Sequence, residues 1–164
     1  MTWPAYLMLA LVTLQRLGEL VLAERNTRRL LARGAHEVGR SHYVFVVFVH
    51  AAWLLTLWLL GPGPAIHVLP LVIYVALQFA RVWVIATLGD RWTTRIIILP
   101  GAPLVGHGPY RWVDHPNYLI VTVEIAVLPL VFGLPTVAGF FTVLNAIILW
   151  VRIREENQAL AAHR

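Results

Sequence analysis

Two polar segments contain most of the side chains suited to chemistry in an otherwise apolar chain. Residues 107–118 bring together histidine, tyrosine and asparagine, and residues 152–160 contain arginines and the adjacent Glu155 and Glu156. Each segment lies at one end of an apolar run. Polar side chains held against a bilayer raise the free energy and therefore usually have a function. Hydrogen-bonding rings, guanidinium groups and carboxylates together are suited to binding a charged, hydroxylated ligand.

The composition indicates a membrane protein. The 164 residues are 59% hydrophobic, above the 45–50% usual for soluble chains, and the mean hydropathy is +0.72. The 13 basic residues are all arginine, and the net charge is +5. They do not alternate with aromatic residues on a polar face, so we expect no nucleic-acid partner. The absence of cysteine excludes disulfides, thiolate catalysis and cysteine metal sites.

Five apolar runs predict an all-α integral membrane protein with about five transmembrane helices, since a span needs about 20 apolar residues. The last two runs are short and joined by Gly133–Leu134–Pro135, which predicts a tight helical hairpin. We expect one domain over residues 1–164, with three spans in 1–88 and a polar loop, the hairpin and a C-terminal helix in 89–164. The runs cover roughly residues 3–23, 42–60, 66–88, 117–133 and 136–151.

Arginines favour one orientation. They occur in segments 24–41 and 89–116 and in the C-terminal tail, whereas 61–65 and 133–135 contain none. The positive-inside rule then places the N-terminus outside and the C-terminus in the cytoplasm. Five spans give the same parity, and both polar segments fall on the cytoplasmic side.

Four charged residues fall inside the apolar runs: Arg16, Glu19, Arg81 and Glu124. All lie at one depth, about one or two turns from the predicted cytoplasmic end. They form either structural ion pairs or the wall of a polar cavity open to the cytoplasm. Because Glu124 lies within two turns of Tyr118, it is the strongest catalytic candidate among them.

Residues 89–118 form a long connection that prolines and glycines keep from being a span. Pro116 suits the first position of a helix, so we expect the fourth helix to start near His115. His107, Tyr110, His115 and Tyr118 then bring hydrogen-bonding rings to one place, although interfacial tyrosines also occur as a belt. We expect no metal site. The remaining histidines, which we expect to be structural, are His36, His42, His50 and His67.

The two segments together resemble the signature of the isoprenylcysteine carboxyl methyltransferase family, membrane enzymes that use S-adenosylmethionine. The matching elements are Leu104–Val105, Gly108–Pro109–Tyr110, His115–Pro116–Asn117–Tyr118, and Arg152 with Glu155–Glu156. The resemblance implies that loop 89–118 binds the cofactor and that Arg152 faces the acceptor. The implied cofactor contacts are Leu104, Val105, Tyr110, His115, Pro116, Tyr118 and Glu156, to which the same motif adds His107 and Asn117 as candidates.

The chain departs from that signature where the family usually has arginine and glycine, since it has Asp114 and Leu119–Ile120. Its N-terminal third, with residues 15–20, resembles a small bacterial branch whose enzymes O-methylate alkylresorcinols or alkylpyrones. The resemblance therefore implies a phenolic or enolic lipid taken from the bilayer, in a bacterial plasma membrane with the site facing the cytoplasm. Arg152 would stabilise the phenolate, and Glu124 or a loop histidine would take the proton.

Three other functions remain open at this stage. One is carboxyl methylation of an isoprenylcysteine-like substrate. Another is an NADPH-dependent membrane enone reductase, whose similar His-Pro-Asn-Tyr element typically continues with Phe-Gly-Glu rather than residues 119–121 here. The third is a small transporter, which would need polar residues in the outer halves of the spans. The sequence leaves the oligomeric state open.

Overall fold

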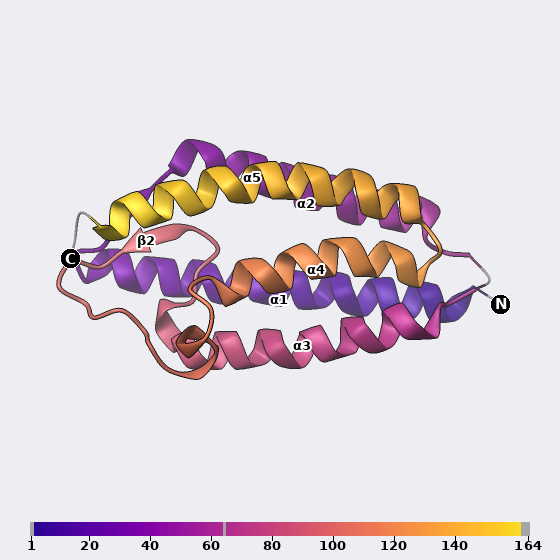
Figure 1. Ribbon diagram of the computed structural model, residues 1–164, viewed down its shortest axis with the longest axis horizontal. Coiled ribbons are helices and arrows are strands. Elements are labelled where there is room, and N and C mark those ends of the chain that lie inside the picture. Colours follow the sequence, from indigo (N-terminus) through magenta and orange to yellow (C-terminus); the bar gives the residue numbers. More distant parts are fainter. Residues whose placement is uncertain (1, 64, 162–164) are drawn as a thin grey trace.

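Five helices run along the long axis of the molecule, and a loop with a small sheet closes one end (Figure 1). The computed structural model describes residues 2–63 and 65–161; the side chain of His42 lies outside the described part. Two single-turn helices, η1 and η2, lie in the segment between α3 and α4. The elements are α1 (Trp3–Ala32), β1 (His36–Val38), α2 (Arg40–Leu60), α3 (Val68–Leu88), η1 (Gly89–Arg91), β2 (Ile96–Ile98), η2 (Gly108–Arg111), α4 (Pro116–Val131) and α5 (Pro135–Ala161).

Four helices of the described residues, rather than about five, are long and apolar enough to cross a membrane: Trp3–Ala32, Tyr43–Leu60, Val68–Arg91 and Pro135–Ala159. The fifth predicted span is α4, whose 16 residues extend about 24 Å, short of the roughly 30 Å of a bilayer core. It is apolar because it packs between α3 and α5, with residues such as Ile125 and Leu128 fully buried. A helix buried between other helices and a helix that faces lipid have similar hydropathy, so hydropathy alone does not distinguish them.

The first helix continues nine residues past the predicted end of its apolar run at residue 23. Residues 24–32 contain three arginines and two leucines, which favour helix, and Glu24 pairs with Arg28 one turn later at 2.9 Å. After the helix ends, β1 pairs antiparallel with β2. Asn26, which is buried, donates to the carbonyl oxygens of Gly89 and Trp92 at 3.2 and 2.8 Å. These contacts fasten the loop after α3 to the end of α1.

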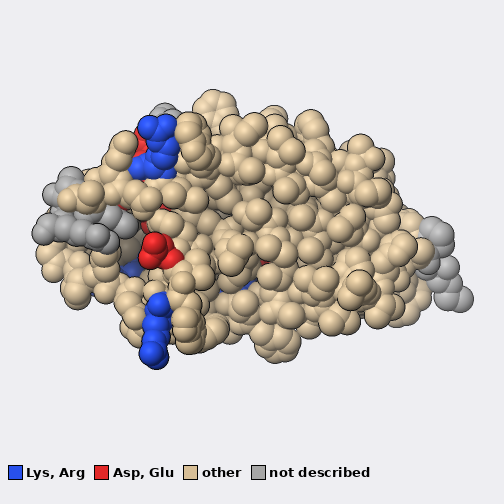
Figure 2. Space-filling model, in the orientation of Figure 1, with Lys and Arg blue, Asp and Glu red and all other residues tan. Residues whose placement is uncertain are grey.

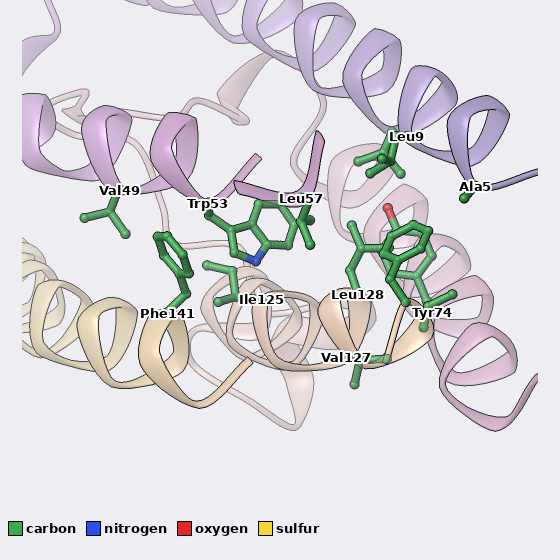
Figure 3. Close-up of a cluster of buried hydrophobic side chains, with 13 residues drawn as sticks. Ala5, Leu9, Val49, Trp53, Leu57, Tyr74, Ile125, Val127, Leu128 and Phe141 are labelled. Carbon is green, nitrogen blue, oxygen red and sulfur yellow. The ribbon is translucent and has the colours of Figure 1, made fainter. Parts of the chain in front are cut away.

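The apolar core lies around α4. Ile125 and Leu128 of α4 face Trp53 and Leu57 of α2, and Phe141 of α5 completes the contact (Figure 3). On the face shown in Figure 2, charged side chains gather toward the end where α5 finishes, and the other end is almost free of charge. The core therefore holds the helices together at the uncharged end, and polar groups are concentrated at the loop end.

The predicted hairpin between the last two helices is present. α4 ends at Val131 and α5 begins at Pro135, with Gly133 between them at φ +71°. A Cβ at Gly133 would lie 3.1 Å from Nε2 of His67, so both backbone conformation and space favour glycine. This turn returns the chain toward the loop end, where α5 brings its polar segment beside the start of α4.

Candidate active site

The start of α4 positions His115 and Tyr118 of the first segment. His115 is the N-cap residue and Pro116 the first helical residue, as the sequence predicted. The His115 ring stacks on the Tyr118 ring with centroids 5.3 Å apart. His115 Nε2 lies 3.1 Å from Asn157 Oδ1 of α5. The ring stack therefore orders the start of the helix, and the hydrogen bond to Asn157 joins it to the C-terminal segment.

A chain of hydrogen bonds links Tyr118 to both charged residues of the second segment. Arg152 Nε donates to the Tyr118 hydroxyl at 2.8 Å, and that hydroxyl donates to Glu156 Oε2 at 2.5 Å. Arg152 Nη2 also donates to the Thr94 carbonyl oxygen at 2.5 Å. Although Arg152 is only 8% exposed, its Nη1 has no hydrogen-bond partner among the described residues. Arg152 is thus held in place with N–H groups to spare for a ligand.

A polar cavity of about 320 Å³ lies at the loop end, a volume typical of a small-molecule site. Its wall combines β2, the loop 104–118 and the last turns of α5, and it contains carboxylates, guanidinium groups and apolar side chains. The lining residues are Leu88, Arg91, Trp92, Thr93, Arg95, Ile96, Ile97, Ile98, Leu104, Val105, Tyr110, Asp114, His115, Asn117, Tyr118, Arg152, Glu156 and Asn157.

A second cavity, also of about 320 Å³, lies deeper among the helices; we call it the apolar cavity. It is bordered mainly by α1 and α2, and most of its wall is aliphatic or aromatic. The lining residues are Thr13, Arg16, Leu17, Glu19, Leu20, Tyr43, Val46, Val47, His50, Ala51, Trp53, Leu54, Arg81, Trp92, Thr93, Thr94, Asn117, Tyr118, Val121, Leu149 and Arg152.

The polar and apolar cavities share one wall, made of Trp92, Thr93, Asn117, Tyr118 and Arg152. Two buried polar atoms of this wall, Asn117 Oδ1 and Trp92 Nε1, have no hydrogen-bond partner among the described residues. An unpaired buried polar atom raises the free energy unless a ligand or water satisfies it. The shared wall therefore offers unsatisfied polar groups to a ligand in either cavity.

The four charged residues inside the apolar runs form one ion-pair network. Arg16 contacts Glu19 at 2.9 Å and Glu124 at 2.8 Å, and Arg81 contacts Glu19 at 3.2 Å. Arg81 also donates to both carboxylate oxygens of Glu124, and Gln78 donates to Oε1 of the same carboxylate at 2.8 Å. Glu124 is 1% exposed and lies in the wall of neither cavity, as far as the described residues define them.

Most residues predicted to bind the cofactor lie together around the polar cavity. Within the described chain, three predicted residues do not line either cavity: His107, Pro116 and Glu124. His107 is the N-cap of η2, and buried Pro116 starts the helix that carries Asn117 and Tyr118.

The loop is fixed by close contacts. Gly108 has φ +60°, and a Cβ there would lie 2.7 Å from Thr87 Oγ1, so only glycine allows η2 to pack on α3. Arg91 Nη1 donates to the Pro103 carbonyl oxygen at 2.8 Å and so holds the loop at the rim of the polar cavity. Burial raises the pKa of the Tyr110 phenol to about 12, and the nearby Glu156 carboxylate adds to the rise. Tyr110 therefore stays protonated and available as a hydrogen-bond donor.

Sequence reasoning missed the contribution of residues 92–98. Trp92 and Thr93 belong to the shared wall, the Thr94 carbonyl holds Arg152, and Ile96–Ile98 form the strand side of the polar cavity. The available signal was the run of β-branched residues directly after a helix, which favours a strand. Its partner β1 is only three residues long, so the pairing itself had no pattern to indicate it.

Comparison with known proteins finds one matching family and two relatives similar along most of their length. The model of the isoprenylcysteine carboxyl methyltransferase (ICMT) family matches residues 68–162. The uncharacterized protein YpbQ of Bacillus subtilis (strain 168) is 35% identical over 160 residues, covering 94% of this chain and 95% of that protein. An uncharacterized protein of Haemophilus influenzae (strain ATCC 51907 / DSM 11121 / KW20 / Rd) is 25% identical over 155 residues, which cover 89% of this chain and 88% of that protein. No solved structure matches the chain.

Proposed function

The chain belongs to the isoprenylcysteine carboxyl methyltransferase family, and from this we propose that it O-methylates a phenolic or enolic lipid such as an alkylresorcinol or alkylpyrone. Membership makes the protein an integral membrane methyltransferase with S-adenosylmethionine as methyl donor. The observation that carries the proposal is the wall shared by the polar and apolar cavities.

The residues of the polar cavity fit S-adenosylmethionine. Glu156 and Asp114 offer carboxylates for an ammonium group or ribose hydroxyls, and Arg91 and Arg95 offer guanidinium groups for a carboxylate. The adenine ring would lie against the aliphatic residues Leu88, Ile96, Ile98, Leu104 and Val105. When bound, S-adenosylmethionine supplies an already activated methyl group, so the protein need only orient the two molecules and exclude water.

The apolar cavity suits a lipid with an alkyl tail. Leu17 and Leu20 of α1 and Val47 of α2 line it and are also exposed on the outer surface of the bundle. In a membrane these residues face acyl chains, so we place the mouth of the cavity between α1 and α2. A tail could then remain in the lipid while the head group reaches the shared wall.

Arg152 is the residue that we assign to the acceptor oxygen. It lines both cavities, is largely buried, and keeps Nη1 free of protein partners among the described residues. A fixed guanidinium group in a site of low dielectric stabilises a developing phenolate or enolate. Tyr118, which holds Arg152 on one side and Glu156 on the other, would align the acceptor side with the donor side.

We further propose that the loop end faces the cytoplasm of a bacterial plasma membrane. The arginine-rich segments 24–41, 89–116 and 152–161 all belong to that end of the fold. Methyl donor made in the cytoplasm would then enter the polar cavity directly.

The proposal is tested with purified protein in lipid nanodiscs and methyl-labelled S-adenosylmethionine. We expect label to pass to an alkylresorcinol, with the mass increase of one methylene group, and not to resorcinol without a tail. Arg152→Gln should abolish transfer, whereas Arg154→Gln, a change on the same helix outside both cavities, should not.

Two results would refute the proposal in different ways. Label passing only to a farnesylcysteine carboxylate would indicate carboxyl methylation, the family reaction itself. NADPH oxidation without label transfer would indicate a reductase.

A further inference from the structure

We propose that His50 is the general base that takes the proton from the acceptor hydroxyl, an inference that rests on the hydroxyl-methylating function proposed above. His50 lies on α2 and lines the apolar cavity together with Tyr118 and Arg152. A carboxylate acceptor has no proton to lose, whereas a phenol or enol is a better nucleophile once a base takes its proton.

The hydrogen bond of the ring fixes which nitrogen can act. His50 Nδ1 lies 2.8 Å from the carbonyl oxygen of Val46, one turn earlier on the same helix. A carbonyl oxygen only accepts, so Nδ1 must carry the proton, and in the neutral ring Nε2 holds the lone pair. Among the described residues the only hydrogen bond of the His50 ring is the one at Nδ1, so Nε2 has no protein partner there. The ring therefore presents a basic nitrogen without a protein partner in a cavity wall.

The other polar groups of the apolar cavity do not offer a comparable lone pair. Glu19 accepts from Gln15 and from Arg16 and Arg81, so its carboxylate is occupied. Arginines have no lone pair to offer, and the amide of Asn117 accepts hydrogen bonds but not protons. The titratable and charged groups facing this cavity, from all five helices, are Arg16, Glu19, Tyr43, His50, Arg81, Tyr118 and Arg152.

The two tyrosines of that wall are also engaged. The hydroxyl of Tyr43 lies 3.0 Å from Thr94 Oγ1, and that of Tyr118 bonds to Arg152 and Glu156. Glu124, the base suggested by the sequence, accepts hydrogen bonds from two arginines and Gln78 and lines neither cavity in the described structure. His50 is thus the best-placed base on the acceptor side.

The step balances without a further reactant. As the oxygen–methyl bond forms and the sulfur–methyl bond breaks, the acceptor O–H proton moves to His50 Nε2. The products are the methyl ether, S-adenosylhomocysteine and an imidazolium ring, which returns its proton to water when the products leave. Arg152 stabilises the negative charge on the oxygen before the methyl group arrives.

The first test measures methyl transfer to an alkylresorcinol. His50→Asn keeps an N–H for the Val46 carbonyl but removes the basic nitrogen, and His50→Gln places an amide near Nε2. We expect both to lower the rate by about 10²- to 10⁴-fold while S-adenosylhomocysteine affinity stays within about twofold. His67→Gln, at an exposed histidine at the other end of the bundle, is the matched control and should leave the rate unchanged.

The same test includes a measurement that would not change if His50 had only a structural role. In His50→Asn the rate should rise about tenfold per pH unit as the free acceptor ionises, and it should recover with acceptors of more acidic hydroxyl. Wild-type rate should level off once His50 is neutral. A His50→Asn deficit of equal size at every pH and with every acceptor would overturn the inference, as would wild-type activity in His50→Gln.

The second test needs no turnover. A nitrophenol carrying an alkyl chain is bound with S-adenosylhomocysteine, and its visible spectrum reports its ionisation. We expect the pH at which half the bound probe is ionised to rise by about one unit or more in His50→Asn, because the proton acceptor beside it is gone. An unchanged midpoint pH would overturn the role of His50 but not the proposed function. Wild-type protein that transfers label to no hydroxyl lipid overturns the proposed function instead.

Discussion

Tyr118→Phe removes the hydroxyl group that links Arg152, on the acceptor side of the site, to Glu156, on the cofactor side. The hydroxyl accepts from Arg152 at 2.8 Å and donates to Glu156 at 2.5 Å. Each hydrogen bond to a charged group contributes about 1.5–3 kcal/mol. Arg152 retains its bond to the Thr94 carbonyl, and the Glu156 side chain is 26% exposed, so water replaces part of the loss.

The free and the bound protein both lose these bonds, so the Kd for S-adenosylhomocysteine changes only because Glu156 is less well held for the ligand. We expect this effect to reach at most the lower end of that range, about 1.5 kcal/mol, or about a tenfold rise in the Kd. Isothermal titration calorimetry in detergent measures it directly. Tyr74→Phe is the matched control, because the buried Tyr74 hydroxyl has no hydrogen-bond partner among the described residues and lines neither cavity. It should leave the Kd unchanged.

A double-mutant cycle with Glu156→Gln sharpens the test. If Tyr118 acts on the cofactor through Glu156, the double variant should lose less affinity than the two single losses combined, with a coupling energy of about 1 kcal/mol. Full additivity, or an unchanged Kd in Tyr118→Phe, would refute the arrangement described for the shared wall.

Three further changes test the frame around the site. Glu124→Gln should lower the free energy of unfolding by about 3 kcal/mol, because it leaves the buried Arg81 and the partly buried Arg16 without a full counter-charge. Glu24→Gln, at an exposed pair, should change it by less than about 0.5 kcal/mol. Tryptophan fluorescence during thermal unfolding compares the two variants, and equal melting temperatures would contradict the network. Gly133→Ala should destabilise by about 1–2 kcal/mol because of its positive φ, whereas Gly18→Ala, inside α1 with open space around it, should be neutral or stabilising in the same assay. Ala51→Trp should fill the apolar cavity and raise the KM for the lipid acceptor about tenfold or more while S-adenosylhomocysteine binding is retained; a parallel loss of both would show that the cavities do not act separately.

The sequence predicted the parts of the fold that depend on local signals. Pro116 marked the start of α4, and Gly133 and Pro135 marked the hairpin, because proline and glycine restrict or release the backbone at single positions. Hydropathy could not distinguish α4 from a full-length span, since burial between helices and contact with lipid select the same apolar residues. Among the described residues, four helices rather than about five meet the length and composition of a span.

Spatial relations of the site were only partly predictable. The link from Tyr118 to Glu156 followed from the family resemblance, which puts both on the cofactor. The pairing of Arg16 with Glu124 joins residues 108 positions apart, and no local pattern indicates such a partner. His50 was expected to be structural, because a lone histidine on an apolar helix can be recognised as a functional candidate only when the cavity beside it is known.

The ion-pair network also implies an order of events during synthesis. Arg16 and Glu19 lie one turn apart and neutralise each other, so the apolar part of α1, residues 3–23, can enter the bilayer with no net charge. Arg81 is inserted next with α3 and pairs with Glu19, which already pairs with Arg16. The two arginines and one glutamate then have one positive charge in excess. Glu124 enters last and restores neutrality. A nascent chain halted after α3 would hold an uncompensated arginine inside the membrane, a costly state that ends only when α4 supplies Glu124.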